Sequence, residues 1–271
     1  MNWHRAEKWL VNVLLYGSMA AILMFFYIPI FTMIAFSFKE TNYMIFPFGG
    51  FSLQWYEKLF EHVDFYDAVT NSFLIAFFTM IIGTTLGTIA ALAWVRYRFK
   101  LRNVFQSINL LPIIFPQLIL GIMLLLWFSV LGNAFEFNTG LITVIIGHVV
   151  YLAPFAMVVV SVQIHAFDDT LEDAARDAGA SIWQVYRDVT LPLIWPGIFS
   201  AAIFVFLLSW GNFYITFYLN GGARTIPTFV FAGLTQGSLP IYPALATLVF
   251  IPGIVLVAVA EHYRRRALAR L

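Results

Sequence analysis

Long apolar runs separated by short polar segments form the pattern along this chain. Each run is close to or above the ~20 residues that a helix needs to cross a hydrocarbon core, and none contains Asp, Glu, Lys or Arg. Strict alternation of apolar and polar positions, which marks a membrane β-strand, is absent from these runs. The pattern predicts an all-α membrane protein, a single transmembrane domain over 1–271 with six helices at approximately 10–38, 69–95, 104–131, 140–164, 193–219 and 243–260.

Composition supports a membrane protein over a soluble domain. Hydrophobic residues make up 61% of the chain and charged residues 11%, and the mean hydropathy is +0.85. The chain has no cysteine, so disulfides and thiolate metal sites are excluded, and we expect no metal site. Arg5 and Lys8 precede the first run as in a secretory signal, but the run is too long and lacks a small-residue cleavage site. We therefore expect it to be retained as a helix.

The basic residues predict the orientation of the helices. If the N-terminus is cytoplasmic, only Lys39, Lys58 and Arg224 of the 15 lysines and arginines lie outside. Positive residues concentrate on the cytoplasmic side of membrane proteins. We therefore expect a multi-pass membrane protein with both termini in the cytoplasm. The basic ends reflect orientation, and no nucleic-acid partner is expected.

The first outer loop contains "FSLQWYEKLF", in which Phe51, Trp55 and Leu59 recur at four-residue spacing. This spacing predicts a short helix that lies in the membrane interface on its aromatic face. Acidic residues follow the same loop, and they form either a solvated rim or a docking surface for an external partner: Glu57, Glu61, Asp64 and Asp67.

The third run contains two interior prolines, Pro112 and Pro116, so we expect a kinked or broken helix there. Broken helices tend to line cavities, because their freed carbonyls need polar partners. Asn109 and Gln117 flank the expected break and are candidates for a solute pathway. Hydrogen bonds between helices are their alternative role.

Three further residues are candidates for the pathway. His148 is the only ionisable side chain near the middle of a run, where such groups are functional candidates. A hydrogen bond to a neighbouring helix is the plainer role for a neutral imidazole. Trp210 and Asn212 flank Gly211 in the fifth run, where they meet a polar solute or allow two helices to approach closely.

The polar segment "TLEDAARDAGASIWQVYRDVTLP" lies in the loop 165–192, between the fourth and fifth runs. Asp169 or Thr170 is expected to cap a first helix with acidic residues in its opening turn, and Gly179 to end it. Ser181 is followed three residues later by Gln184, the spacing of a capping box, which predicts a second short helix. Small side chains permit close approach of another surface, so we interpret the two helices as a docking element; an ordinary solvated loop is the alternative.

This segment resembles the "EAA" loop of permease subunits in binding-protein-dependent ABC importers. The family pattern is E-A-A, three residues, Gly, nine residues and I-x-L-P, and the segment from Asp173 to Pro192 keeps that spacing, with Asp for Glu and Val189 for Ile. The resemblance implies the type I importer permease fold and a coupling helix in a groove of an ATPase subunit. The coupling residues that it implies are Glu172, Asp173, Ala174, Ala175, Ala178, Gly179, Ala180, Ser181 and Pro192.

Most of the chain is also similar to the second permease of spermidine/putrescine-type importers, in "SFKETNY", "LLPIIFPQLILGIMLL" and "YPALATLVFI" among other segments. That resemblance implies ATP-driven import of a small polar solute, a polyamine or a related organic compound, across the bacterial inner membrane. An acidic pair common in those permeases is replaced here at Gly211–Asn212. The implied partners are two ATPase subunits, a second related permease, a periplasmic or extracellular solute-binding protein and membrane lipid.

The chain has no G-x-x-x-x-G-K-[ST], so we expect no cofactor in it, with ATP and Mg²⁺ bound by the partner ATPase. An ion-coupled secondary transporter or channel is the alternative, although the runs lack the buried carboxylates that such proteins typically use. Neither H-E-x-x-H nor G-x-S-x-G occurs, and we expect no catalytic residues.

Overall fold

A computed structural model of the chain describes residues 3–41, 49–135, 138–235 and 241–251. The chain divides into two compact units, residues 1–63 with 232–271, and residues 64–231. Every named element in the described residues is a helix, and one isolated bridge pairs Lys39 with Phe51. The all-α class is therefore confirmed, whereas a single domain over the whole chain stays a prediction.

The first unit contains α1 (Trp3–Ser37), α2 (Gln54–Glu61) and a helix at Ile241–Ile251. Only 6% of the apolar window in α1 is buried within the chain, which suits a helix surrounded by lipid. In α2, Trp55 and Leu59 are buried, and the Trp55 indole N–H donates to the Lys39 carbonyl at 2.5 Å. The expected helix is present; Trp55 and Leu59 pack inside the chain, whereas Phe51 is 83% exposed, and the position of this helix in the membrane interface stays a prediction.

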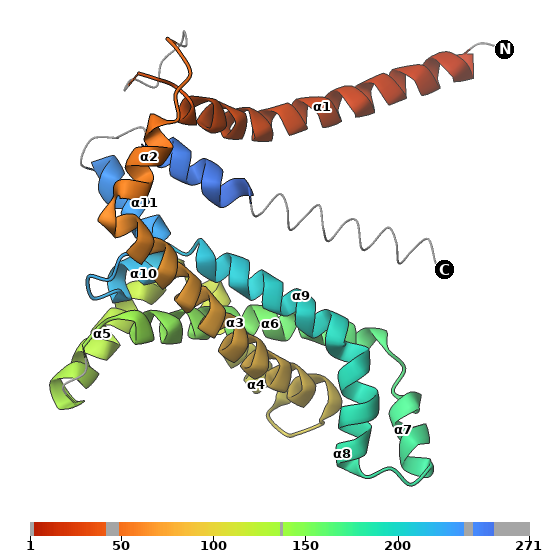
Figure 1. Ribbon diagram of the computed structural model, residues 1–271. Coiled ribbons are helices and arrows are strands. Elements are labelled where there is room, and N and C mark those ends of the chain that lie inside the picture. Colours follow the sequence, from red (N-terminus) through yellow and green to blue (C-terminus); the bar gives the residue numbers. More distant parts are fainter. Residues whose placement is uncertain (1–2, 42–48, 136–137, 236–240, 252–271) are drawn as a thin grey trace. The chain divides into compact units, whose positions relative to one another are not determined.

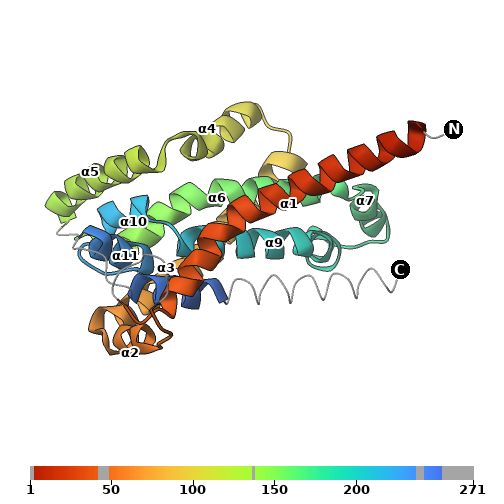
Figure 2. The same ribbon diagram turned by 90° about the horizontal axis from the view of Figure 1, so that it is seen from above.

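The second unit is built around α6 (Leu141–Ala166), which packs along α9 (Leu191–Trp210) (Figures 1 and 2). Small residues bring its helices into close contact. A Cβ on Gly197 of α9 would lie 2.5 Å from Gln163 Cβ, and one on Gly87 of α3 (Val63–Arg96) would lie 2.5 Å from Ala156 Cβ. Such residues let membrane helices approach until their backbones touch. The buried apolar side chains of α3, α5, α6, α9 and α10 form one cluster around these crossings.

The predicted third span is two helices, α4 (Arg102–Ile114) and α5 (Gln117–Phe135). The break lies at Phe115 and Pro116, while Pro112 is accommodated inside α4. Proline disfavours helical backbone in the residue before it, which explains why Phe115 is extended. The expected break is confirmed.

The prediction of one helix over the fifth span, 193–219, is wrong. Helix α9 ends at Trp210, and α10 (Tyr214–Leu219) begins after three further residues. The apolar composition continues through the break, so the hydrophobic pattern does not reveal it. Close packing holds α10 in place: a Cβ on Gly121 of α5 would lie 3.2 Å from the Tyr214 carbonyl, and one on Gly147 of α6 would lie 2.6 Å from Leu219 Cδ1.

Five helices in the described residues are long and apolar enough to cross a membrane. The predicted sixth span, 243–260, is described only as far as residue 251, within the helix Ile241–Ile251, and the remainder lies outside the described residues. A further apolar helix, α11 (Ile226–Thr235), follows the fifth span.

Candidate functional site

The loop after α6 folds as two helices around a glycine. The first helix, α7 (Thr170–Asp177), ends at Ala178, and Gly179 follows with φ +89°. That left-handed conformation favours glycine, as the sequence predicts. Ser181 Oγ accepts from the Gln184 amide at 3.4 Å, and the Gln184 side chain accepts from the Ser181 amide at 2.8 Å. The predicted capping box therefore begins α8 (Ile182–Val185).

Asp169 occupies the N-cap position of α7, as predicted, but its side chain makes no capping bond. The preceding residue supplies that bond, because Asp168 Oδ1 accepts from the Thr170 amide at 3.0 Å. Hydrogen bonds from the Thr170 backbone and side chain hold the pKa of the Asp168 carboxyl below its usual value, because they favour the charged form. The prediction missed this residue because both neighbouring aspartates match the capping pattern.

The second short helix does not stop before the fifth span. A single π turn, Tyr186–Thr190, joins α8 to α9, and the Leu191 amide donates to the Tyr186 carbonyl five residues back. Pro192 lies in the first turn of α9, as predicted, although the helical backbone continues into α9 from the π turn without a break. A wide turn before the proline accommodates its ring, which would otherwise press on the carbonyl one turn back.

Most of the predicted coupling residues lie at the surface of the loop. Ala175 and Ala180 are half-buried, and the others apart from Glu172 are exposed: Asp173, Ala174, Ala178, Gly179, Ser181 and Pro192. Beside them, Ile182 and Trp183 are 68% and 72% exposed. A shallow apolar hollow of about 240 Å³ adjoins Trp183. The loop thus presents small and apolar side chains on a backbone that is fixed by caps and turns.

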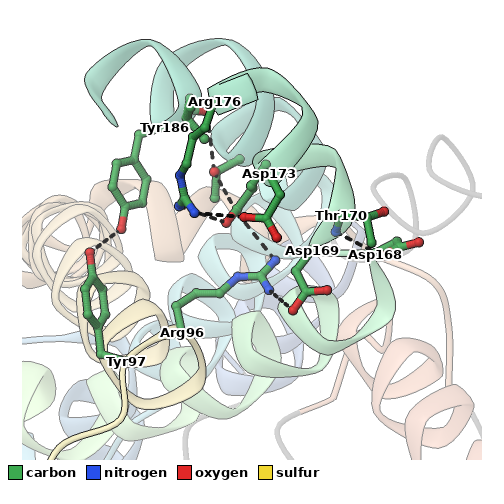
Figure 3. Close-up of polar contacts among 11 residues, drawn as sticks. Arg96, Tyr97, Asp168, Asp169, Thr170, Asp173, Arg176 and Tyr186 are labelled. Atoms are coloured by element: carbon green, nitrogen blue, oxygen red, sulfur yellow. Dashed lines mark hydrogen bonds and ion pairs between the residues drawn. The ribbon is translucent and has the colours of Figure 1, made fainter. Parts of the chain in front are cut away.

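Glu172 differs from its neighbours because its side chain turns inward. Its carboxylate accepts a hydrogen bond from Thr190 Oγ1 at 2.8 Å, and Arg96 Nη2 at the end of α3 lies 3.5 Å from Oε1. Arg176 Nη2 lies 4.0 Å from the other carboxylate oxygen. Figure 3 shows Arg96 reaching from α3 beneath α7 toward Asp169. The carboxylate therefore joins α3, α7 and the π turn.

His148 lies at the break of the fifth span. It is 1% exposed, and its Nδ1 and Nε2 lie 2.8 Å from Ser209 Oγ and 2.9 Å from Thr216 Oγ1. The one hydroxyl hydrogen of Thr216 goes to the Asn212 carbonyl at 2.8 Å, so Thr216 must accept from Nε2–H. Nδ1 shares a hydrogen bond with the Ser209 hydroxyl. His148 therefore links the end of α9 to α10.

The other pathway candidates divide into two groups. Asn212 is buried and its Oδ1 accepts from the Ile215 amide, while Trp210 is half-buried and stacks on Phe206. Asn109 donates to the Phe105 carbonyl in its own helix, and Gln117 begins α5. Among the described residues, no hydrogen bond connects Asn109 or Gln117 with the His148 network. The structure thus brings together His148 and Asn212, beside Trp210, and not all five.

Three residues of these networks escaped the sequence analysis: Arg96, Thr190 and Thr216. Arg96 was interpreted only as one of the basic residues that predict orientation, and threonine is common in helices. The partner can lie far away along the chain, 68 residues in the case of His148 and Thr216. Within the described residues, no group of three or more His, Cys, Asp or Glu is arranged to hold a metal ion.

Comparison with known proteins identifies the class of protein. Residues 83–268, more than half of the chain, match the family described as "Binding-protein-dependent transport system inner membrane component". The chain belongs to this family. It is therefore a permease subunit of a membrane transport system, as the resemblance of its loop predicts.

Relatives of this permease include the putrescine transport system permease protein PotI of Escherichia coli K12, which is 33% identical over 97% of this chain and 96% of its own. The spermidine/putrescine transport system permease protein PotC of Haemophilus influenzae is 28% identical over 92% and 95%. The sequence resemblance to the second permease of polyamine-type systems is confirmed.

Solved structures share the fold. A chain of a bacterial ABC transporter involved in the import of the acidic polysaccharide alginate superposes with a TM-score of 0.78, at 22% identity, over 97% of this chain and 98% of its own. A chain of the MetNI methionine ABC transporter gives 0.60 at 20% identity, over 80% and 98%. These matches confirm the fold of an ABC importer permease.

Proposed function

We propose that this permease forms half of the translocation pathway of an ATP-driven importer for a polyamine or a related small organic compound. A second, related permease supplies the other half, and two ATPase subunits bind ATP and Mg²⁺. A solute-binding protein delivers the solute to the outer loops. The names of the relatives, one for putrescine and one for spermidine and putrescine, support this substrate class.

The exposed apolar surface of the loop carries the proposal. Ile182 and Trp183 lie on a short helix that is fixed by its capping box, yet both are more than two-thirds exposed. Exposed large apolar groups on an ordered segment mark protein contact sites. We place the ATPase on this surface, together with Asp173, Ala174 and Ala178. The π turn then connects the docked segment to α9 without a break in the helix.

The contacts of His148 argue against the alternative of ion-coupled transport. A proton-coupled transporter needs an ionisable group that exchanges protons within the membrane. Both ring nitrogens of His148 are engaged by hydroxyl groups of α9 and α10, in an arrangement that explains the residue structurally. Its described contacts favour a role in fixing the broken span.

A comparison of two exposed tryptophans tests the docking surface. Trp183→Ala should abolish co-purification of the ATPase subunits and ATP-dependent uptake of radiolabelled putrescine into proteoliposomes. Trp195→Ala is the control, because Trp195 is 57% exposed but lies within α9. Uptake that disappears with an uncoupler at constant ATP, or full ATPase binding by the Trp183 variant, would overturn the proposal.

A further inference from the structure

We propose that Arg96 and Glu172 are positioning residues that make the second span move together with the coupling loop. The proposal rests on the proposed function, since it concerns how movement of the docked loop reaches the membrane helices. Glu172 lies on α7, and Arg96 is the last residue of α3, the second span. The loop already continues into α9, so this pair gives it a second connection.

Burial makes the pair more than a surface contact. The side chains of Arg96 and Glu172 are 15% and 10% exposed, and the guanidinium carbon lies 4.2 Å from the centre of the Phe167 ring. Exposed ion pairs contribute little because water and salt screen them, but a buried charge that loses its partner is strongly unfavourable. Arginine is suited to this position, because its planar group stacks on an aromatic ring and pairs with carboxylates at once.

The distances from Arg96 to its two carboxylate partners suit a contact that persists when α7 changes its angle. Arg96 lies 3.5 Å from Glu172 and 3.8 Å from Asp169, which is ion-pair contact beyond ordinary hydrogen-bond length. Coulomb attraction decreases gradually with distance, whereas a hydrogen bond weakens steeply with angle. The guanidinium can therefore keep both carboxylates as α7 rotates. Glu172 itself stays bound to Thr190 in the π turn.

A second contact supports the same direction of coupling. The hydroxyl groups of Tyr97, just past the end of α3, and Tyr186, in the π turn, lie 2.5 Å apart (Figure 3). Two independent contacts thus tie the end of α3 to the segment between the loop and α9. A push on α7 reaches α3 through Arg96, and a movement of the π turn reaches it through Tyr97.

The test measures solute imported per ATP hydrolysed in the reconstituted complex. Arg96→Gln should bind the ATPase as the wild type does. Arg96→Gln and Glu172→Gln should each import at least about fivefold less putrescine per ATP, the low end of typical coupling energies. Arg98→Gln is the matched control. Arg98 is exposed in the same basic segment, and in the described part of the chain no ion pair joins it to the loop.

The double variant separates coupling from stability. Arg96→Gln with Glu172→Gln removes both charges and leaves neither buried alone, so it should fold even if a single variant does not. Its import per ATP should equal that of the single variants, because the two residues act as one unit. Wild-type import per ATP in this variant would overturn the inference. Such a result would leave the proposed function intact, whereas failure of the wild-type chain to bind any ATPase would refute the proposed function instead.

Discussion

The crossing of α3 and α6 at Gly87 allows a prediction with a defined magnitude. A Cβ at this position would lie 2.5 Å from Ala156 Cβ, 2.7 Å from the Ala153 carbonyl oxygen and 2.8 Å from the Met157 amide nitrogen. Two of these three atoms belong to the backbone of α6 and cannot rotate away. Gly87→Ala therefore forces the two helices apart by roughly 0.5–1 Å, which is overpacking of a closely packed contact.

We expect the variant to be less stable by ~1–2 kcal/mol. Overpacking typically costs ~1–3 kcal/mol, and the better helix propensity of alanine offsets up to ~1 kcal/mol of that. The free energy of unfolding can be measured by titrating the purified protein from mild detergent into SDS. Because Arg96 ends the same helix, the separation should also reduce putrescine import per ATP in the reconstituted complex.

Gly83→Ala is the control for the same helix, one turn earlier. The nearest atom to a Cβ there is Val205 Cγ1 at 3.6 Å, an ordinary van der Waals contact. This variant should be as stable as the wild type, or slightly more stable because of its helix propensity. If the Gly87 and Gly83 variants unfold at the same SDS fraction as the wild type, the close crossing at Gly87 is not real and the reasoning fails.

Two further predictions concern the break in the fifth span and the orientation of the chain. His148→Phe keeps a ring at this position but removes both hydrogen bonds, so it should lower the free energy of unfolding by ~1 kcal/mol, at ~0.6 kcal/mol per interhelical bond. Ser209→Ala removes one of the two bonds and should cause about half that loss. Equal stability of the wild type and both variants would contradict the network. Since the chain has no cysteine, a single introduced cysteine reports on which side of the membrane it lies. With the predicted topology, an impermeant maleimide added to intact cells should label Glu57→Cys and should leave Ser181→Cys unlabelled until the membrane is opened. The reverse labelling pattern would refute the predicted topology.

Local features of this fold could be predicted from the sequence. Long uncharged apolar runs predicted the spanning helices, Pro116 the break in the third span, and Gly179 with Ser181 the two-helix loop. Each of these signals acts within a few residues, through backbone conformation or through the length of hydrocarbon to be crossed. They are readable because no distant partner is needed to produce them.

Features that depend on distant residues could not be predicted. The break at Gly211 lies in a run that is apolar on both sides, and it is held by His148 and by the close packing of α10 on Gly121 and Gly147. The inward position of Glu172 depends on Arg96, 76 residues earlier in the numbering. One signal was available: Gly83 and Gly87 form a G-x-x-x-G pattern, which is typical of close helix crossings in membranes.

The π turn keeps the residues from Ile182 to Trp210 in one unbroken helix, which bends where α8 meets α9 (Figure 1). The 20 residues of α9 measure roughly 30 Å at helical rise, about the thickness of the hydrocarbon core of a bilayer. A tilt of α9 by about 5° about one end would displace the opposite end by roughly 2.6 Å, close to the diameter of a water molecule. A small angular change at the end next to the loop would therefore be enough to open or close a water-sized gap at the other end.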